Sequence, residues 1–248
     1  QTPLDYLRLK LYSRVDNIYL REVEFGYANG WGTAAIDLLN TSDSSHDVRF
    51  QLSLKQANQA KAIQSLPGFN TLESDLNQAQ LDADQQARTK GTIDLNLHAH
   101  GPHKNPYQFQ GYGNLIVNNK QLGAIQLLGP LSEILQNTRL NFTSFNLEQL
   151  TASFAIDWEQ LNITDLIING PRTRIWANGT FQIPDQTLNM DISVNLFANV
   201  GKADSKMHTL RKLITYPLPN LLIFNLSGTI YNQKIRSYYD PRNLIPNF

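Results

Sequence analysis

The sequence predicts a mainly β protein organised as one long curved antiparallel sheet, accompanied by three or four short amphipathic helices. The first observation behind this prediction is a repeated alternation of apolar and polar residues, which places every second side chain of a strand on one face. The second is that the alternating segments after residue 139 are joined by short connections, which require antiparallel neighbours. Such a sheet forms either an apolar groove or a rolled-up core resembling a sandwich or barrel.

The amino-terminal quarter shows the alternation first. Asn29-Gly30 predicts a tight turn between two of its strands. Residues 55–66 carry alanines and an isoleucine at helical spacing and end before Pro67-Gly68, which predicts an amphipathic helix. Strands are expected at residues 7–12, 17–27, 31–39 and 48–54.

The rest of the chain adds further strands and helices. Helices are expected at residues 121–136, where Gly129-Pro130 interrupts the apolar stripe, and at residues 204–216. Residues 72–88 have helical composition without a clear apolar face. Residues 1–248 are expected to form a single elongated all-β domain, with a possible sub-boundary near residues 67–90. The remaining strands are expected at residues 92–99, 106–117, 139–143, 149–157, 161–168, 173–182, 187–197, 221–230 and 233–239.

The composition excludes several classes of function. Lys and Arg together number 21 and so do Asp and Glu, so no net charge favours nucleic acid as a partner. The chain has no cysteine, which excludes disulfides and thiolate sites. It also lacks the sequence signatures of serine hydrolases, nucleotide-binding loops and zinc proteases. We therefore expect no catalytic residues, no cofactor and no metal.

The order of signals from residue 91 to residue 245 resembles the carboxy-terminal region of AsmA-like proteins, the bacterial envelope family related to TamB and YhdP. One position departs from the family pattern, because Asp157-Trp158-Glu159 stands where a small turn such as Asp-Gly is usual. The matching stretches are Gly111-Tyr-Gly-Asn-Leu-Ile-Val-Asn-Asn-Lys-Gln-Leu, Ile125-Gln-Leu-Leu-Gly-Pro-Leu, Thr143-Ser-Phe-Asn-Leu-Glu-Gln-Leu-Thr-Ala-Ser-Phe-Ala-Ile, Ala177-Asn-Gly-Thr-Phe, Leu188-Asn-Met-Asp-Ile and Leu226-Ser-Gly-Thr-Ile.

The resemblance implies a long curved sheet with an apolar inner face, located in the periplasm and tethered to the inner membrane by a segment outside this sequence. It further implies a role in moving or accommodating lipids between membranes, in support of outer-membrane lipid homeostasis or assembly. The implied partners are lipids or a membrane surface, together with other envelope proteins. No catalytic residues and no nucleic acid are implied.

The apolar side chains of the cleanest strands are the candidate lipid-groove residues. A continuous apolar face can hold acyl chains, because burial of each methylene contributes about 0.8 kcal/mol. The same alternation is equally compatible with a closed core, and the pattern does not choose between the two. The candidates are Leu150, Phe154, Ile156, Leu188, Met190, Ile192, Val194 and Leu196.

Charged and aromatic residues suggest weaker candidates. The basic residues Lys206, Arg211 and Lys212 surround the apolar stripe of residues 204–216, which favours either contact with anionic lipid headgroups or a lid with solvated cations. Arg174 and Trp176, with Arg172, share one strand face that could bind a sugar or a protein, although packing of arginine on tryptophan is commoner. A carbohydrate- or protein-binding β-sandwich, or a purely structural envelope domain, is thus the alternative.

His98, His100 and His103 form the one histidine cluster of the sequence. His98 and His100 fall on the same face of a strand, where both imidazoles could meet a metal ion. No carboxylate lies near enough in sequence to complete the ligand set, so a solvated polar face explains them better. Asp82 and Asp84 are likewise without supporting residues for metal or acid–base chemistry.

Overall fold

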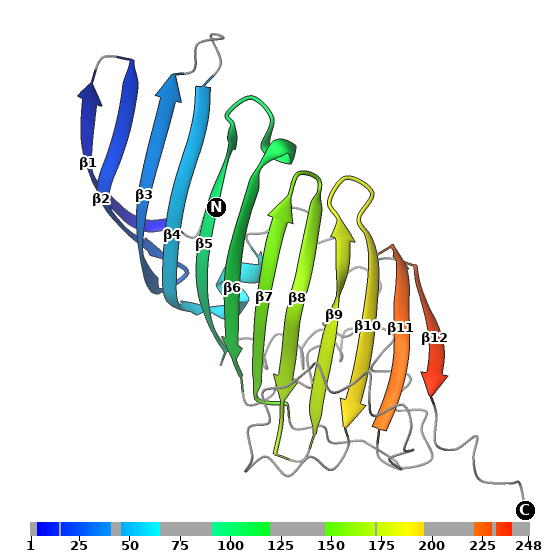
Figure 1. Ribbon diagram of the computed structural model, residues 1–248. Helices are drawn as coiled ribbons and strands as arrows, with labels where there is room; N and C mark the ends of the chain where they lie inside the picture. Colours follow the sequence, from blue (N-terminus) through cyan, green and yellow to red (C-terminus); the bar gives the residue numbers. More distant parts are fainter. Residues whose placement is uncertain are drawn as a thin grey trace, which may run out of the picture.

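The chain forms one open antiparallel sheet in which neighbours in sequence are neighbours in space. The computed structural model describes residues 4–14, 16–40, 46–64, 91–119, 147–171, 173–195, 221–229 and 232–239. Within these ranges twelve strands follow one another as a single meander (Figure 1). The prediction of a mainly β, antiparallel fold is confirmed.

The twelve strands have between seven and thirteen residues each. The first six are β1 (Leu4–Arg14), β2 (Asn17–Tyr27), β3 (Gly30–Asn40), β4 (His46–Asn58), β5 (Thr92–Pro102) and β6 (Gln110–Asn118). The other six are β7 (Gln149–Asp157), β8 (Gln160–Asn169), β9 (Arg174–Gln182), β10 (Thr187–Asn195), β11 (Leu221–Thr229) and β12 (Gln233–Tyr239).

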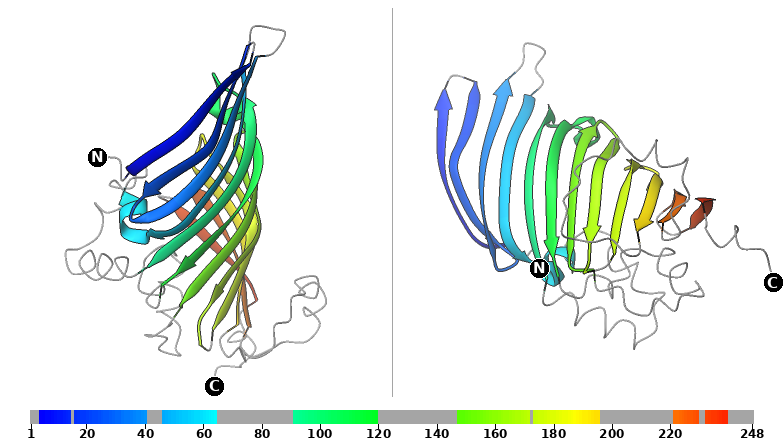
Figure 2. Two further views of the ribbon diagram at one scale, coloured as in Figure 1. Left: turned by 90° about the vertical axis from the view of Figure 1, so that its left-hand side faces the viewer. Right: turned by 60° about the horizontal axis from the view of Figure 1, so that its bottom comes forward.

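The sheet twists and curves along its whole width, as expected for so many strands (Figure 2). The short helix α1 (Gln59–Gln64) lies on the concave side of the sheet, as the left view of Figure 2 shows. Ala62 of α1 packs in one buried cluster with Leu54 and Ala57 of β4. Because Leu54 and Ala57 point to the same side as α1, the apolar face of the sheet is its concave face.

The expected three or four amphipathic helices are not borne out. Within the described residues the helices are α1 and one turn of 3₁₀ helix at Pro106–Gln108, which Asn105 caps by accepting a hydrogen bond from the Tyr107 N–H. The helix expected at residues 55–66 begins only at Gln59, because β4 continues to Asn58 in pairing with β5. Hydrogen-bonded pairing of β4 with β5 outweighs the helical spacing of the alanines in this segment. The segments at 72–88, 121–136, 139–143 and 204–216 and the sub-boundary near 67–90 lie outside the described residues.

Three of the described turns use residues other than glycine in a left-handed conformation, one of them through Gln186 (φ 52°) between β9 and β10. Ala28 (φ 51°) and Asn29 (φ 63°) form the turn between β2 and β3, so the predicted turn lies one residue earlier than Asn29-Gly30. Ala28 is held there because its carbonyl accepts a hydrogen bond of 2.7 Å from the Asn58 N–H. Trp158 (φ 60°) likewise supplies the positive φ between β7 and β8, where a glycine would be usual.

Across the described ranges, none of the helices combines the length and the apolar character that crossing a bilayer requires.

Candidate functional site

The candidate site is the concave apolar face, and β10 shows how it is built. Leu188, Met190, Ile192 and Val194 share one face of β10, as their alternation predicts. Cross-strand partners lie on the same face, so the register extends this apolar set sideways. Their partners are Gly228, Leu226, Phe224 and Leu222 of β11, and Phe181, Gly179, Ala177 and Ile175 of β9.

The same pairing continues from one side of the sheet to the other. Three rows of inward-facing residues cross all twelve strands, and they are apolar or glycine from β1 to β11. The middle row consists of Leu9, Val23, Ala34, Leu52, Leu97, Gly113, Phe154, Ile163, Gly179, Met190, Leu226 and Ile235.

Bulges keep these rows in phase. A slip of one residue in a strand would turn its whole apolar set to the polar face. The ladders shift at Glu22 (φ 48°) in β2 and at Gln56 (φ 54°) in β4, where one extra residue restores the inward position of the next apolar side chain. The Gln56 N–H donates to Asp94 Oδ1 at 2.7 Å, which fixes the second bulge. A further bulge at Thr164 and Asp165 keeps Ile163 and Leu166 of β8 on the same face, so continuity of the apolar face depends on polar residues at these bulges.

The predicted groove residues meet on this face. Leu150, Phe154 and Ile156 of β7 occupy three different rows and pair with Ile168, Ile163 and Leu161 of β8. Val194, Met190 and Leu188 of β10 lie in the same three rows, three strands further along, and Ile192 lies in the row of Ala152. Leu196 lies outside the described residues.

Burial differs strongly along the face. At the carboxy-terminal end, Val194 is 0 % and Phe224 3 % exposed, and both belong to a cluster of ten buried residues. At the amino-terminal end, Leu7 is 55 % and Leu11 61 % exposed although they occupy equivalent inward positions. The face is therefore a packed core at β9–β11 and an open apolar surface at β1.

The prediction missed this open end. Leu4, Leu7, Leu9 and Leu11 are absent from the predicted site, yet all four lie on the apolar face of β1. The signal was available, since the last three alternate with Arg8 and Lys10. Alternation predicts a strand there, but only the register of the whole sheet places β1 and β10 on one continuous face.

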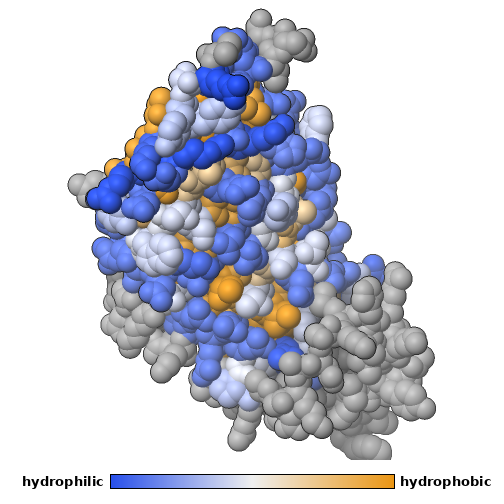
Figure 3. All heavy atoms as spheres, turned by 60° about the vertical axis from the view of Figure 1, so that its left-hand side comes forward, coloured by the Kyte–Doolittle hydropathy of each residue, from blue (hydrophilic) through white to orange (hydrophobic). Residues whose placement is uncertain are grey.

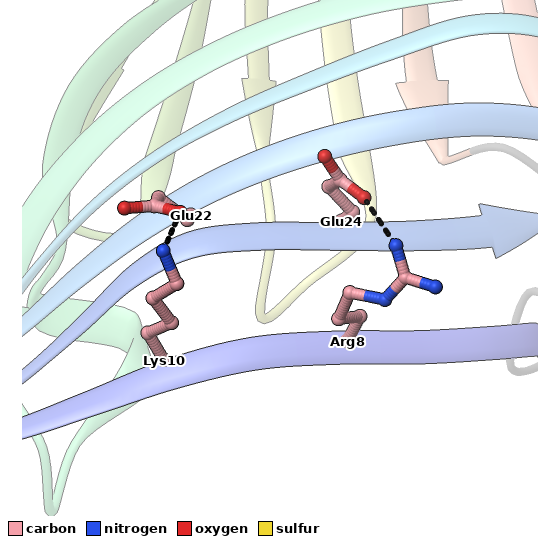
Figure 4. A network of polar contacts seen from close by, with 4 residues as sticks. All are labelled: Arg8, Lys10, Glu22 and Glu24. Atoms are coloured by element: carbon pink, nitrogen blue, oxygen red, sulfur yellow. Dashed lines mark hydrogen bonds and ion pairs between the residues drawn. The ribbon is translucent and has the colours of Figure 1, made fainter.

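The opposite face is hydrophilic. In the oblique view of Figure 3, hydrophilic residues cover most of the described surface and hydrophobic ones show between them as separate patches. Two ion pairs join β1 to β2 on this face, Arg8 to Glu24 at 3.6 Å and Lys10 to Glu22 (Figure 4). The hydrogen bond from Lys10 to Glu22 raises the pKa of the Lys10 ammonium.

A broad hollow of about 810 Å³ lies over the polar face between β2 and β7. Arg21 and Asp37 form an ion pair at its rim, and the hydrogen bond between them raises the pKa of the Arg21 guanidinium. His98 lines the hollow and stacks on Tyr112 with ring centroids 5.0 Å apart. The positively and negatively charged residues that line the hollow are equal in number, so the lining favours neither an anionic nor a cationic ligand.

The histidine cluster does not assemble a metal site in the part of the chain described. His98 and His100 share the polar face of β5, as their spacing predicts, and pair with Gln51 and Arg49 of β4. His103 follows in the exposed turn after β5. No group of three potential ligands within the described residues could hold a metal ion.

The aromatic candidate on the polar face adopts the expected packing. The Arg174 guanidinium lies over the Trp176 ring, 5.5 Å from its centroid, and Arg174 Nε donates to Asn169 Oδ1 at 2.8 Å. Both side chains of the pair are half-buried. Arg172, Asp82, Asp84 and the membrane-contact candidates Lys206, Arg211 and Lys212 lie outside the described residues.

Comparisons of the chain with family models, with curated proteins and with solved structures found no match.

Proposed function

We propose that the protein binds lipids along its concave apolar face, holding or conducting acyl chains. The observation that carries this proposal is the row of inward side chains, apolar or glycine from β1 to β11, that remains exposed at β1. With strands about 4.8 Å apart, the face is about 50 Å wide along the hydrogen-bonding direction, longer than the roughly 30 Å hydrocarbon core of a bilayer. An acyl chain lying on it would gain about 0.8 kcal/mol per buried methylene.

The cellular setting of this proposal rests on the resemblance to AsmA-like proteins alone. On that basis the protein works in the periplasm of a bacterial envelope, tethered to the inner membrane by a segment outside the present sequence. Its partners are lipids or a membrane surface and other envelope proteins, and its role is binding without catalysis. The lipids that it carries then serve assembly or homeostasis of the outer membrane.

The decisive experiment compares the two faces at neighbouring positions. A photoreactive benzophenone side chain is introduced at Leu11 and Leu97, which face inward, and at Tyr12 and His98, which face outward on the same strands. The protein is illuminated with vesicles of phosphatidylethanolamine and phosphatidylglycerol, and adducts are read by mass spectrometry. We expect lipid adducts from the inward positions only.

Tyr12 is the matched control for Leu11, because their exposed fractions are similar, 50 % and 61 %. Equal labelling from both faces would mean non-specific adsorption and would reject the groove. Extraction of the purified protein provides an independent readout, since a bound lipid survives purification and appears in the organic phase. Absence of lipid in both measurements would reject lipid binding by this face.

A second candidate function is recognition of a carbohydrate or a protein by the polar face. The observation in its favour is the Arg174–Trp176 stack, which places a cation and an aromatic ring side by side on the polar face. Trp176→Ala should then abolish binding on a glycan array while leaving lipid content unchanged. The half-buried state of both side chains makes this the weaker candidate.

A further inference from the structure

The hollow on the polar face is bordered by side chains from several neighbouring strands. Its volume is about 810 Å³, and its lining residues come from each of the strands β2 to β7 (Figure 1). With strands about 4.8 Å apart, the lining extends about 24 Å across the sheet. Strand pairing arranges the outward side chains in two adjacent rows, one from Ala35 of β3 to Tyr112 of β6 and the other from Asp37 of β3 to Asp157 of β7. The hollow is therefore an elongated polar surface.

The arginines and aspartates of this lining balance one another. Arg21 forms an ion pair with Asp37. The other two are Arg49 and Asp157, and neither has an ion-pair partner within the described part of the chain. An ionic ligand would meet repelling as well as attracting charges here and would still lose its hydration. An uncharged polar ligand avoids that cost and finds hydrogen-bonding groups along the whole lining.

Tyr112 adds an aromatic surface to the hollow. Its ring stacks on His98, with centroids 5.0 Å apart and planes at 11°, and yet the residue is 62 % exposed. The cross-strand neighbour on the other side is Ala155 of β7, whose methyl group is too short to cover the ring. Stacking on one side thus fixes the orientation of the ring, while much of its apolar surface remains available to a ligand.

Groups that bind hydroxyls lie in the row beside this ring. Gln110 Nε2 donates to Asp157 Oδ1 at 2.9 Å, which orients the carboxylate and leaves its second oxygen to accept further hydrogen bonds. Asp157 is a diagonal cross-strand neighbour of Tyr112, a relation that corresponds to about 7–8 Å. Further along the same row Arg49 supplies N–H donors. Donors and acceptors therefore accompany the aromatic surface.

From these observations we propose that the hollow binds an uncharged oligosaccharide. A sugar ring has a face of C–H groups, which packs on the electron-rich face of an aromatic ring such as Tyr112. Its hydroxyls donate and accept hydrogen bonds, and Asp157 and Arg49 supply the complementary groups. The width of the lining suits several sugar units in a row. This site is separate from the Arg174–Trp176 pair on β9, and it lies on the face opposite the proposed lipid site.

The probes are linear hexasaccharides, whose binding to the whole chain is measured by isothermal titration calorimetry. Three of them are uncharged, namely chitohexaose, maltohexaose and methyl-esterified hexagalacturonate. Unesterified hexagalacturonate is the matched control, because it has the backbone of the third probe with a carboxylate on every unit. We expect at least one uncharged probe to bind, and hexagalacturonate to bind at least about ten-fold more weakly than that probe.

Variants of the protein locate the site. Tyr112→Ala should weaken binding about ten-fold, whereas Tyr112→Phe keeps the ring and should bind as the unchanged protein does. Trp176→Ala removes the aromatic ring of the other pair on the polar face and should leave binding unaltered. Because Tyr112 is exposed, its replacement should leave the fold intact, which circular dichroism checks.

Hydroxyl-radical footprinting gives a separate readout of the contact. A bound saccharide should protect Tyr112 from oxidation. Tyr238 of β12 is the matched control, because it is similarly exposed, at 58 %, and lies outside the hollow. Its reactivity should not change when the saccharide is added.

Absence of binding by all three uncharged probes would overturn the proposal, as would binding that Tyr112→Ala leaves unchanged. Loss of binding in Trp176→Ala alone would also overturn it and would place recognition at the Arg174–Trp176 pair. Equal binding of hexagalacturonate and the uncharged probes would reject the assigned ligand class. These measurements contain no lipid, so their outcome is independent of the lipid-binding proposal.

Discussion

The two ends of the apolar face carry the same pattern and have different surroundings. Val194 of β10 and Leu11 of β1 both sit at inward positions of alternating strands, yet one is completely buried and the other is mostly exposed. Alternation therefore identifies which side chains share a face. It does not determine whether the face is filled, because burial depends on what else contacts it.

Because the two ends differ in burial, one end contributes to the stability of the fold and the other offers a surface for binding. Fully burying a large aliphatic or aromatic side chain contributes about 1.5–3 kcal/mol, so the cluster around Phe224 and Val194 stabilises the fold. The leucines of β1 contribute little to stability while they face water. Their apolar surface is available for a lipid.

The largest expected effect is at the packed end. Phe224→Ala removes a ring that is 3 % exposed from the centre of the buried cluster, and it should lower the free energy of unfolding by about 3–5 kcal/mol. Urea unfolding followed by circular dichroism measures the change. A loss below about 1 kcal/mol would mean that the carboxy-terminal end is as open as β1, and the contrast between the ends would disappear.

Replacing a glycine of the apolar face by alanine should have an intermediate effect on the free energy of unfolding, and the effect should differ between the two halves of the face. A Cβ added to Gly179 in β9 would lie 2.7 Å from the Met190 Cα, and Gly179 also has a φ of 155°. Because backbone cannot move aside cheaply, Gly179→Ala should cost about 1–3 kcal/mol. At Gly32 in β3 the obstacle is the Phe25 ring, whose Cε2 would be 2.6 Å away.

The Phe25 ring can swing aside, because it lies on the open half of the sheet and is only half-buried. Gly32→Ala should therefore destabilise the protein less than Gly179→Ala when both are measured by urea unfolding. The reverse order would indicate that the amino-terminal half is the more rigidly packed of the two.

The regular parts of this fold were predictable from local pattern. The sequence pattern predicts a strand at residues 149–157, the bounds that β7 has. Alternation in β10 likewise predicts one face for Leu188, Met190, Ile192 and Val194. These predictions succeed because the side-chain period of a strand is two and each face meets a different environment. The prediction that short connections join antiparallel neighbours succeeds for a geometric reason too, because parallel neighbours need a much longer connection.

The exceptions to local pattern were not predictable. Residues 55–58 have helical composition but remain in β4, where pairing with β5 holds them. Ala28 and Trp158 adopt positive φ, which their side chains disfavour and which the adjoining strands impose. The bulges at Glu22 and Gln56 depend on the register of neighbouring strands. Each of these features is set by a contact distant in sequence, as is the burial that distinguishes β10 from β1.

The smallest expected effect is at the open end. Leu11→Ala should change the free energy of unfolding by less than about 1 kcal/mol, because most of the Leu11 surface is already in water and its removal leaves no cavity. Tyr12→Ala, on the opposite face of the same strand, is the matched control and should behave similarly in urea unfolding.

Phospholipid should separate these two variants. A ligand that binds only the native state stabilises it in proportion to its affinity, so added lipid should raise the unfolding midpoint of Tyr12→Ala more than that of Leu11→Ala. The difference arises because Leu11 would contact the acyl chains and Tyr12 would not. If Leu11→Ala instead cost as much as Phe224→Ala without lipid, β1 would already be covered in solution, and a lipid would find no apolar surface there.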